Sequence, residues 1–176
     1  MLSCGPCPVY SLDASAFIDF RPFRRDVFGS MWQLAGELAD DRRLLMCEEA
    51  SKECRDPELK QFIQTHPGMI VRLQDYHEHF RQLQAEAPIH GIELVNPSST
   101  RDRADPFVVA LALALEQRGV GDLRVRTNPS AVCAVVTHEL PKGPGAKYVK
   151  IPNACSFYGL QCIDWQELLL QQGYHD

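Results

Sequence analysis

Short apolar runs alternate with longer segments of helical periodicity along this chain, and this alternation constrains the fold more than any other feature. Strands are expected at residues 9–13, 44–46, 131–137 and 161–163. Helices are expected at 26–40 (with Asp26 as N-cap), 48–54, 58–65, 69–85, 105–117 and 153–158, and from Trp165 onward. Strands that alternate with helices form a parallel sheet through right-handed crossovers. The sequence therefore predicts an α/β fold in which helices cover a parallel sheet.

Composition narrows the classes of protein to which the chain can belong. A length of 176 residues favours one domain, which we place at residues 9–176 behind a flexible leader at 1–8. The net charge of -5 argues against indiscriminate nucleic-acid binding. No apolar run approaches the roughly 20 residues that span a bilayer, and no signal-peptide pattern opens the chain. Seven scattered cysteines favour a reducing cytoplasm over a disulfide framework.

Acidic residues recur at the expected ends of strands and at one helix start. They are Asp13, the group Glu48, Glu49 and Glu53, then Asp105, and finally Glu139. The carboxyl ends of parallel strands meet at one edge of a sheet, so these side chains are expected to converge. Crowded carboxylates repel one another unless a cation is present, and Mg²⁺ or Mn²⁺ prefers oxygen ligands. Such a site supports phosphodiester hydrolysis.

Each acid also has an ordinary structural interpretation. Asp105 before Pro106 has the pattern of an N-cap with proline at the first helical position. The glutamates at 48–53 are compatible with a solvated helix face, and Glu139 with the start of a loop. Asp13 is the hardest to explain in this way, because a charged residue at the end of a buried strand usually has a partner or a task.

The order and context of these acids resemble a known family. Residues 13–15, 49–53, 104–110 and 135–139 are similar, in this order, to the four acidic motifs of PIN-domain nucleases. The tail at 150–155 and 159–164 resembles one bacterial PIN-like subfamily, and the resemblance covers nearly the whole chain from Val9. It implies a three-layer α/β/α sandwich with a central parallel sheet. It also implies an Mg²⁺- or Mn²⁺-dependent endoribonuclease, the toxin of a type II toxin–antitoxin pair held inactive by a cognate antitoxin.

The resemblance also assigns roles to individual residues. Asp13, Glu53 and Asp105 match metal-binding acids, and Glu139 falls where the family more often has aspartate. The resemblance implies that Ser15 and Thr137 support this group, and Glu49 is a second choice beside Glu53, one helical turn away. PIN-like domains often pair, and the helices at 58–85 offer apolar surface for a homodimer.

Basic residues near the motifs are candidates for contact with an RNA backbone: Arg24, Arg25, Arg43, Lys142 and Lys147. An ordinary salt-bridged surface explains them equally well. The Cys4–Cys7 pair has the spacing of a thioredoxin-type redox motif, but it precedes the first strand instead of following one.

Two other functions compete with the nuclease. A phosphatase with an aspartyl nucleophile needs a second acid two residues after the first, and Ser15 occupies that position. A catalytically inactive binding module that has kept the fold is the second alternative, and the glutamate at position 139 leaves it open.

Overall fold

The computed structural model describes residues 8–20, 22–94, 104–117 and 132–174. Five parallel strands form the central sheet in the order β3-β2-β1-β4-β5. Their bounds are β1 Val9–Leu12, β2 Leu44–Cys47, β3 Ile70–Val71, β4 Cys133–Val136 and β5 Gln161–Ile163. All residues of β1, β2 and β4 are buried, as expected for strands that are covered on both faces.

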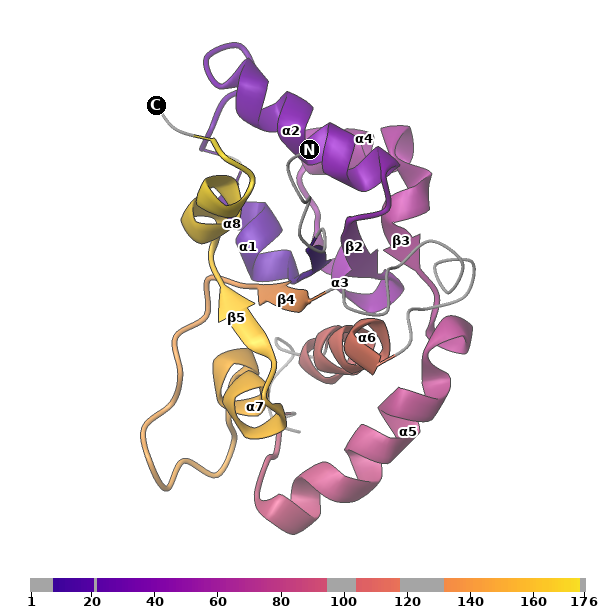
Figure 1. The fold of residues 1–176 in the computed structure, drawn as a ribbon, viewed down its shortest axis with the longest axis vertical. Coiled ribbons are helices and arrows are strands. Elements are labelled where there is room, and N and C mark those ends of the chain that lie inside the picture. The colour runs from indigo at the N-terminus through magenta and orange to yellow at the C-terminus, as the bar shows by residue number, and fades with distance from the viewer. Residues whose placement is uncertain (1–7, 21, 95–103, 118–131, 175–176) are drawn as a thin grey trace, which may run out of the picture.

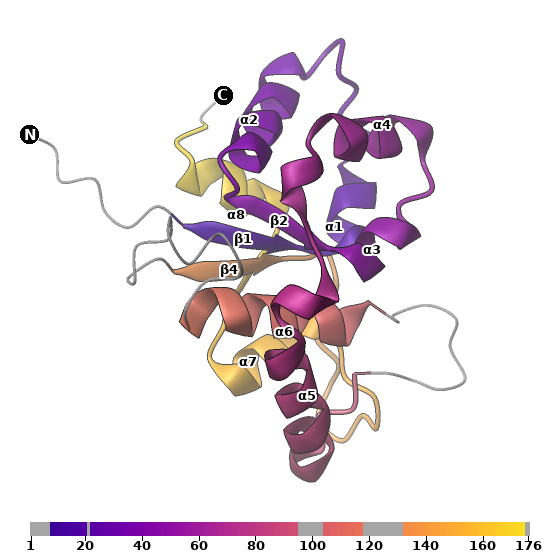
Figure 2. The ribbon, with the colours of Figure 1, turned by 90° about the vertical axis from the view of Figure 1, so that its right-hand side faces the viewer.

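Helices cover both faces of the sheet, so the fold is the expected three-layer α/β/α sandwich (Figures 1 and 2). The layer on one face holds α1 (Ala14–Asp19), α2 (Gly29–Asp40), α4 (Pro57–Thr65) and α8 (Trp165–Gln171). The layer on the other face holds α5 (His77–Glu86), α6 (Asp105–Gln117) and α7 (Ile151–Tyr158). The short helix α3 (Glu48–Glu53) lies at the carboxyl end of β2.

The helix α6 is the central element of its layer, and it contacts β1, β2 and β4 as well as α5 and α7. Because the sheet and two helices surround α6, nearly every side of this helix is buried, and apolar residues occupy nearly every side. The hydroxyl of Ser11 on β1 donates to the Val108 carbonyl at 3.1 Å, which attaches the first turns of α6 to the middle of the sheet. None of the helices that the structure describes is long and apolar enough to cross a membrane.

Three sequence predictions about the elements are wrong in detail. The segment 69–85 is not one helix, because it contains the two-residue strand β3 and begins its helix α5 only at His77. The helix α1 follows β1 directly, in a segment where the sequence predicted no helix. Asp26 does not cap a helix: α2 begins at Gly29, and the Asp26 carboxylate accepts two hydrogen bonds from Arg24 at 2.6 and 3.0 Å.

The order of the strands creates a crevice at one edge of the sheet. The chain passes from β1 to β2 on one side, and it later places β4 on the other side of β1. In open α/β sheets, ligands bind outside the carboxyl ends of the strands where the order reverses in this way. That position here lies between the ends of β1 and β4, at what we call the carboxyl edge. The first and fourth acidic motifs follow these two strands.

Candidate functional site

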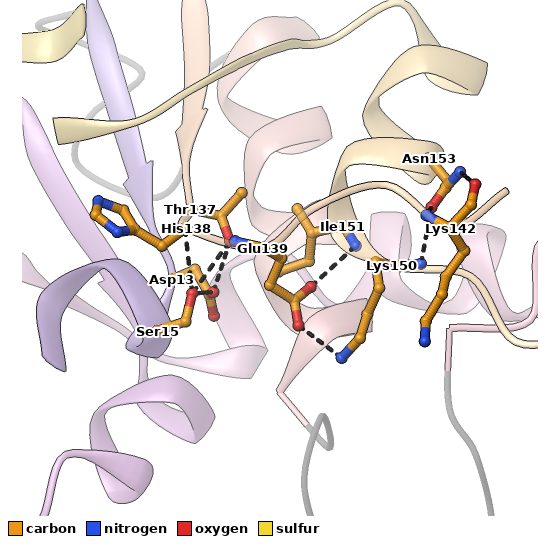
Figure 3. Close-up of polar contacts among 9 residues, drawn as sticks. All are labelled: Asp13, Ser15, Thr137, His138, Glu139, Lys142, Lys150, Ile151 and Asn153. Atoms are coloured by element: carbon orange, nitrogen blue, oxygen red, sulfur yellow. Dashed lines mark hydrogen bonds and ion pairs between the residues drawn. The ribbon is translucent and has the colours of Figure 1, made fainter. Parts of the chain in front are cut away.

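Asp13 directly follows β1, and two hydroxyl groups bind its carboxylate (Figure 3). Ser15 Oγ donates to Asp13 Oδ2 at 2.5 Å, and Thr137 Oγ1 donates to the same oxygen at 2.9 Å. Ser15 comes from the first turn of α1 and Thr137 from the end of β4. The structure therefore brings together the three residues for which the sequence predicted mutual support.

The hydrogen bonds around Asp13 form two chains in which backbone amides donate to hydroxyls and the hydroxyls donate to the carboxylate. The backbone N–H of His138 donates to Ser15 Oγ at 3.3 Å, and that of Glu139 donates to Thr137 Oγ1 at 3.2 Å. Each hydroxyl has one proton, which it directs at Asp13, so the contact of 3.2 Å between the two hydroxyl oxygens is not a hydrogen bond in this arrangement. Backbone amides thus orient the hydroxyls, and the hydroxyls orient the carboxylate.

Burial dominates the electrostatics of Asp13, which is only 4% exposed. Desolvation raises the pKa of its carboxyl, the hydrogen bonds from Ser15 and Thr137 lower it, and the charge of Glu139 raises it. The net pKa lies above the ordinary value. An ionised Asp13 is therefore unfavourable in the folded protein unless positive charge lies nearby.

Glu53, at the end of α3, shares its surroundings with Asp13. The buried Cys54 thiol has its pKa raised to about 12, by burial first and then by the charges of Asp13 and Glu53. Both carboxylates therefore lie close enough to act on one thiol. Glu49, the second choice from the sequence, instead accepts a hydrogen bond from the buried Tyr76 hydroxyl at 3.3 Å. Glu49 also acts, together with Asp13 and Glu53, on the buried Cys47 thiol and raises its pKa, so both glutamates of α3 share the surroundings of Asp13.

Asp105 begins α6 and is 4% exposed, as buried as Asp13. The carbonyl of Ala104 accepts the N–H groups of Phe107 and Val108, at 2.9 and 3.0 Å, which places Asp105 within the first turn. A crossover helix runs back along the sheet, so the start of α6 lies toward the carboxyl ends of the strands. α6 also contacts α3, the helix that carries Glu53.

Glu139 has a different environment from the other acids. Lys150 Nζ donates to Glu139 Oε1 at 2.6 Å, and the backbone N–H of Ile151 donates to Glu139 Oε2 at 3.3 Å (Figure 3). The side chains of Glu139 and Lys150 are only 13% and 21% exposed. The carboxylate thus forms a shielded ion pair and binds the first amide of α7, where a helix stabilises negative charge.

Asn153 closes the loop that joins Glu139 to α7. Its Oδ1 accepts the N–H groups of Lys142 and Lys150, at 2.9 and 3.1 Å, and its Nδ2 donates to the Lys142 carbonyl at 3.0 Å. Together with the Glu139 ion pair, these bonds hold both ends of the loop together (Figure 3). The sequence was compatible with Glu139 as the start of a loop but gave Asn153 no role. The Pro152-Asn153 pair was the sequence signal that could have predicted a helix start with a capping side chain here.

The basic residues proposed from the sequence do not lie together. Lys142 and Lys147 are exposed on the loop beside Glu139. Arg24 pairs with Asp26 on the surface, and Arg25 lies over the Trp32 ring with its guanidinium 5.2 Å from the ring centre. Arg43 precedes β2, at the opposite end of the sheet from Asp13, and bonds the Pro8 carbonyl and Gln172 at 3.2 and 2.9 Å.

Of the four predicted metal-binding acids, the structure places Glu139 where its charge acts on Asp13, and Glu53 where its charge acts with that of Asp13 on the Cys54 thiol. Asp105 lies in the adjoining layer, on α6, which contacts α3. Across the described residues, no three His, Cys, Asp or Glu side chains are arranged as a group that could hold a metal ion. The leader at 1–8 and its Cys4–Cys7 pair fall, apart from Pro8, outside the described residues. The irregular segment at 88–104 is described only in part, to Leu94 and from Ala104.

Comparison with known proteins gives a family. The model described as "Domain of unknown function (DUF4411)" matches residues 10–122 and 124–175, and the chain belongs to this family. Searches of curated proteins and of solved structures each gave no significant match. The resemblance to PIN-domain nucleases thus remains a prediction from the sequence.

Proposed function

We propose that this member of the DUF4411 family is a divalent-metal-dependent endoribonuclease of the PIN type. The observation that carries the proposal is Asp13. It is a buried carboxylate at the point where the strand order reverses, and hydroxyls from two separate segments orient it. A fold that only needed a stable strand end would not bury a carboxyl there, with the charge of a second acid, Glu139, acting on it.

The residues present suit a hard cation in their chemistry. Asp13 and Asp105 are buried carboxylates, and Glu53 adds a third acid from the neighbouring helix. Mg²⁺ and Mn²⁺ take such oxygen ligands, together with water and phosphate oxygens. When bound, such an ion activates water and neutralises charge that builds on the phosphate. It would also offset the desolvation of Asp13, which is the main reason why the pKa of that carboxyl is raised.

The protein itself would supply orientation and charge. Ser15 and Thr137 hold Asp13 Oδ2 in one position, and their bonds favour its ionised form. Lys142 and Lys147 project from the closed loop beside the carboxyl edge and would contact the RNA backbone. The cognate antitoxin, the homodimer through the helices at 58–85 and the cytoplasmic location remain predictions from the sequence.

A second candidate is a binding module without catalytic activity. The observation that favours it is the ion pair of Glu139 with Lys150, because a lysine already neutralises the acid of the fourth motif. The aspartyl-phosphatase alternative is weaker. The residue at position 15 is a serine whose hydroxyl is directed at Asp13, and a serine is a poor general acid for a leaving group.

The experiment that tests the nuclease is cleavage of labelled single-stranded RNA in Mn²⁺, Mg²⁺ or EDTA. The wild type is compared with the Asp13→Asn, Asp105→Asn double variant, after circular dichroism has shown that both are folded. Metal-dependent cleavage that the double variant lacks would support the proposal. No cleavage in any metal, together with no cation binding by calorimetry, would refute it and leave the binding module.

A further inference from the structure

A pocket of about 570 Å³ lies beside the carboxyl edge, between α8, the start of α2 and the segment that joins α1 to α2. Its volume is in the range of small-molecule sites. Its lining is mostly apolar and includes Phe23, Phe28, Met31, His138, Trp165 and Leu169. None of these residues has a role in the proposed metal site, and His138 is the one that adjoins it.

Aromatic side chains form much of the pocket wall. Trp165 is 3% exposed, stacks on Phe20 with ring centres 4.5 Å apart, and donates its indole N–H to the Ala16 carbonyl at 2.7 Å. Phe28 is 38% exposed and meets Phe23 edge to face at 5.4 Å. Trp165 thus belongs to the buried wall of the pocket, and Phe28 offers the exposed ring on which a planar ligand can stack.

The rim of the pocket carries acceptors of hydrogen bonds. Asp164 lines it, and its Oδ1 accepts the N–H of Glu167 at 2.8 Å, which fixes the carboxylate at the start of α8. The His138 ring lies at the rim in contact with Asp19, Nδ1 to Oδ2 3.1 Å. Asp19 does not itself line the pocket, so Asp164 is the carboxylate that faces a ligand there. Its negative charge disfavours a phosphate or any other anion at this position and favours a ligand that presents N–H donors.

His138 connects the pocket to the carboxyl edge. Its backbone N–H donates to Ser15 Oγ, which in turn donates to Asp13. In Figure 3 the side chains of His138 and Glu139 point in opposite directions, with Asp13 between them. A nucleic-acid strand whose backbone lies at the carboxyl edge would therefore pass the mouth of this pocket.

We infer that the pocket binds an unpaired nucleobase that carries an exocyclic amino group, such as adenine or cytosine. The exposed Phe28 ring can stack on the planar base, and the Asp164 carboxylate can accept from the amino group. An exocyclic amino group offers two N–H donors, whereas the uracil of uridine offers only its single N3–H. The inference rests on the proposed function for the position of the strand. It extends that proposal by giving the enzyme a preference among bases beside the cleaved bond.

The test uses neutral nucleosides, because they carry no phosphate and need no metal. Adenosine, cytidine and uridine are titrated into the full chain in EDTA, followed by calorimetry and by tryptophan fluorescence. We expect adenosine and cytidine to bind at least about fivefold more tightly than uridine, and Phe28→Ala to weaken adenosine binding by at least about fivefold. Phe28→Tyr, which keeps the ring, should bind as the wild type does.

A matched control removes an exposed apolar side chain elsewhere. Ile89 is 80% exposed, and Ile89→Ala should leave nucleoside binding unchanged. Equal affinity for adenosine and uridine in the wild type would overturn the inference even if Phe28→Ala did not fold. So would no nucleoside binding up to the solubility limit, which would point to a protein side chain as the occupant.

The outcomes separate this inference from the proposed function. RNA cleavage without any base preference in nucleoside binding would retain the nuclease and reject the base pocket. Selective nucleoside binding without RNA cleavage would retain the pocket and reject the nuclease.

Discussion

Asp13 and Glu139 follow neighbouring parallel strands and lie at the same edge of the sheet, but the fold surrounds them with different chemistry. Asp13 is buried among neutral hydroxyl donors, and its pKa is raised by the loss of water. Glu139 is bound by the ammonium group of Lys150 and by a backbone amide at the start of α7. The first carboxylate is oriented without being neutralised, whereas the second already has a cation within the chain.

This difference suggests that the two acids have different tasks. A carboxylate that is buried, oriented and not neutralised is suited to bind a cation that comes from solution. A carboxylate in a shielded ion pair is suited to hold a helix and a loop in place. We therefore expect Asp13 to matter most for activity and Glu139 to matter most for the stability of the loop at 140–150.

The largest expected effect is on RNA cleavage. Asp13→Asn should lower the rate in Mn²⁺ by more than about a hundredfold, whereas Glu139→Gln should lower it by about tenfold or less. The reason is that the first change removes a proposed ligand and the second an orienting group. Initial rates on a labelled single-stranded RNA measure both. An equal loss in the two variants would show that Glu139 also binds the metal and that the comparison is wrong.

The Glu139–Lys150 pair should show coupling in the free energy of unfolding. Urea denaturation of Glu139→Gln, Lys150→Met and the double variant should give a coupling of about 1–2 kcal/mol in EDTA, because the pair is largely shielded from water. The matched control is Arg24 and Asp26, whose side chains are 74% and 61% exposed. We expect no measurable coupling for that pair, and the same absence for Glu139 and Lys150 would contradict a structural role.

Asp13→Asn should stabilise the protein when no metal is present. A folded-state pKa above the unfolded value of about 3.9 means that the stabilising contribution of Asp13 is complete below that pH and is lost as the pH rises through the folded pKa. The Tm of the variant should therefore exceed that of the wild type by an amount that grows from about pH 4 to neutral pH. Each kcal/mol gained in the free energy of unfolding raises Tm by about 2–4 °C. Calorimetric scans in EDTA measure it, and a variant less stable than the wild type at every pH would refute this expectation.

The smallest effect is expected from the hydroxyls themselves. Their hydrogen bonds lower the pKa of Asp13, so Thr137→Val and Ser15→Ala should each raise that pKa further. Carbon-13 NMR of the carboxyl group, titrated against pH in EDTA, follows the shift directly. The pKa of Asp13 should be raised more in the double variant than in either single variant. An unchanged pKa would mean that the hydroxyls do not act on the ionised form.

The sequence by itself determined the architecture and the positions of most elements. The alternation of apolar runs and helical segments predicted a parallel sheet covered by helices, since buried strands and amphipathic helices differ in period and length. β5 was predicted with its exact bounds, and β1, β2, β4 and α6 with nearly exact ones. The resemblance to PIN-domain motifs also implied that Ser15 and Thr137 support Asp13, and both hydroxyls bind its carboxylate.

Only the tertiary structure decided the pairing of polar groups. The strand β3 has two residues, too few for any period to show, and its register comes from its contacts with β2. Glu49 accepts a hydrogen bond from Tyr76, which reaches it from a segment 27 residues away. The partner of Glu139 lies 11 residues further along, across a loop whose path Asn153 sets. Side-chain partners across such separations depend on how the chain folds back, and local periodicity carries no record of that.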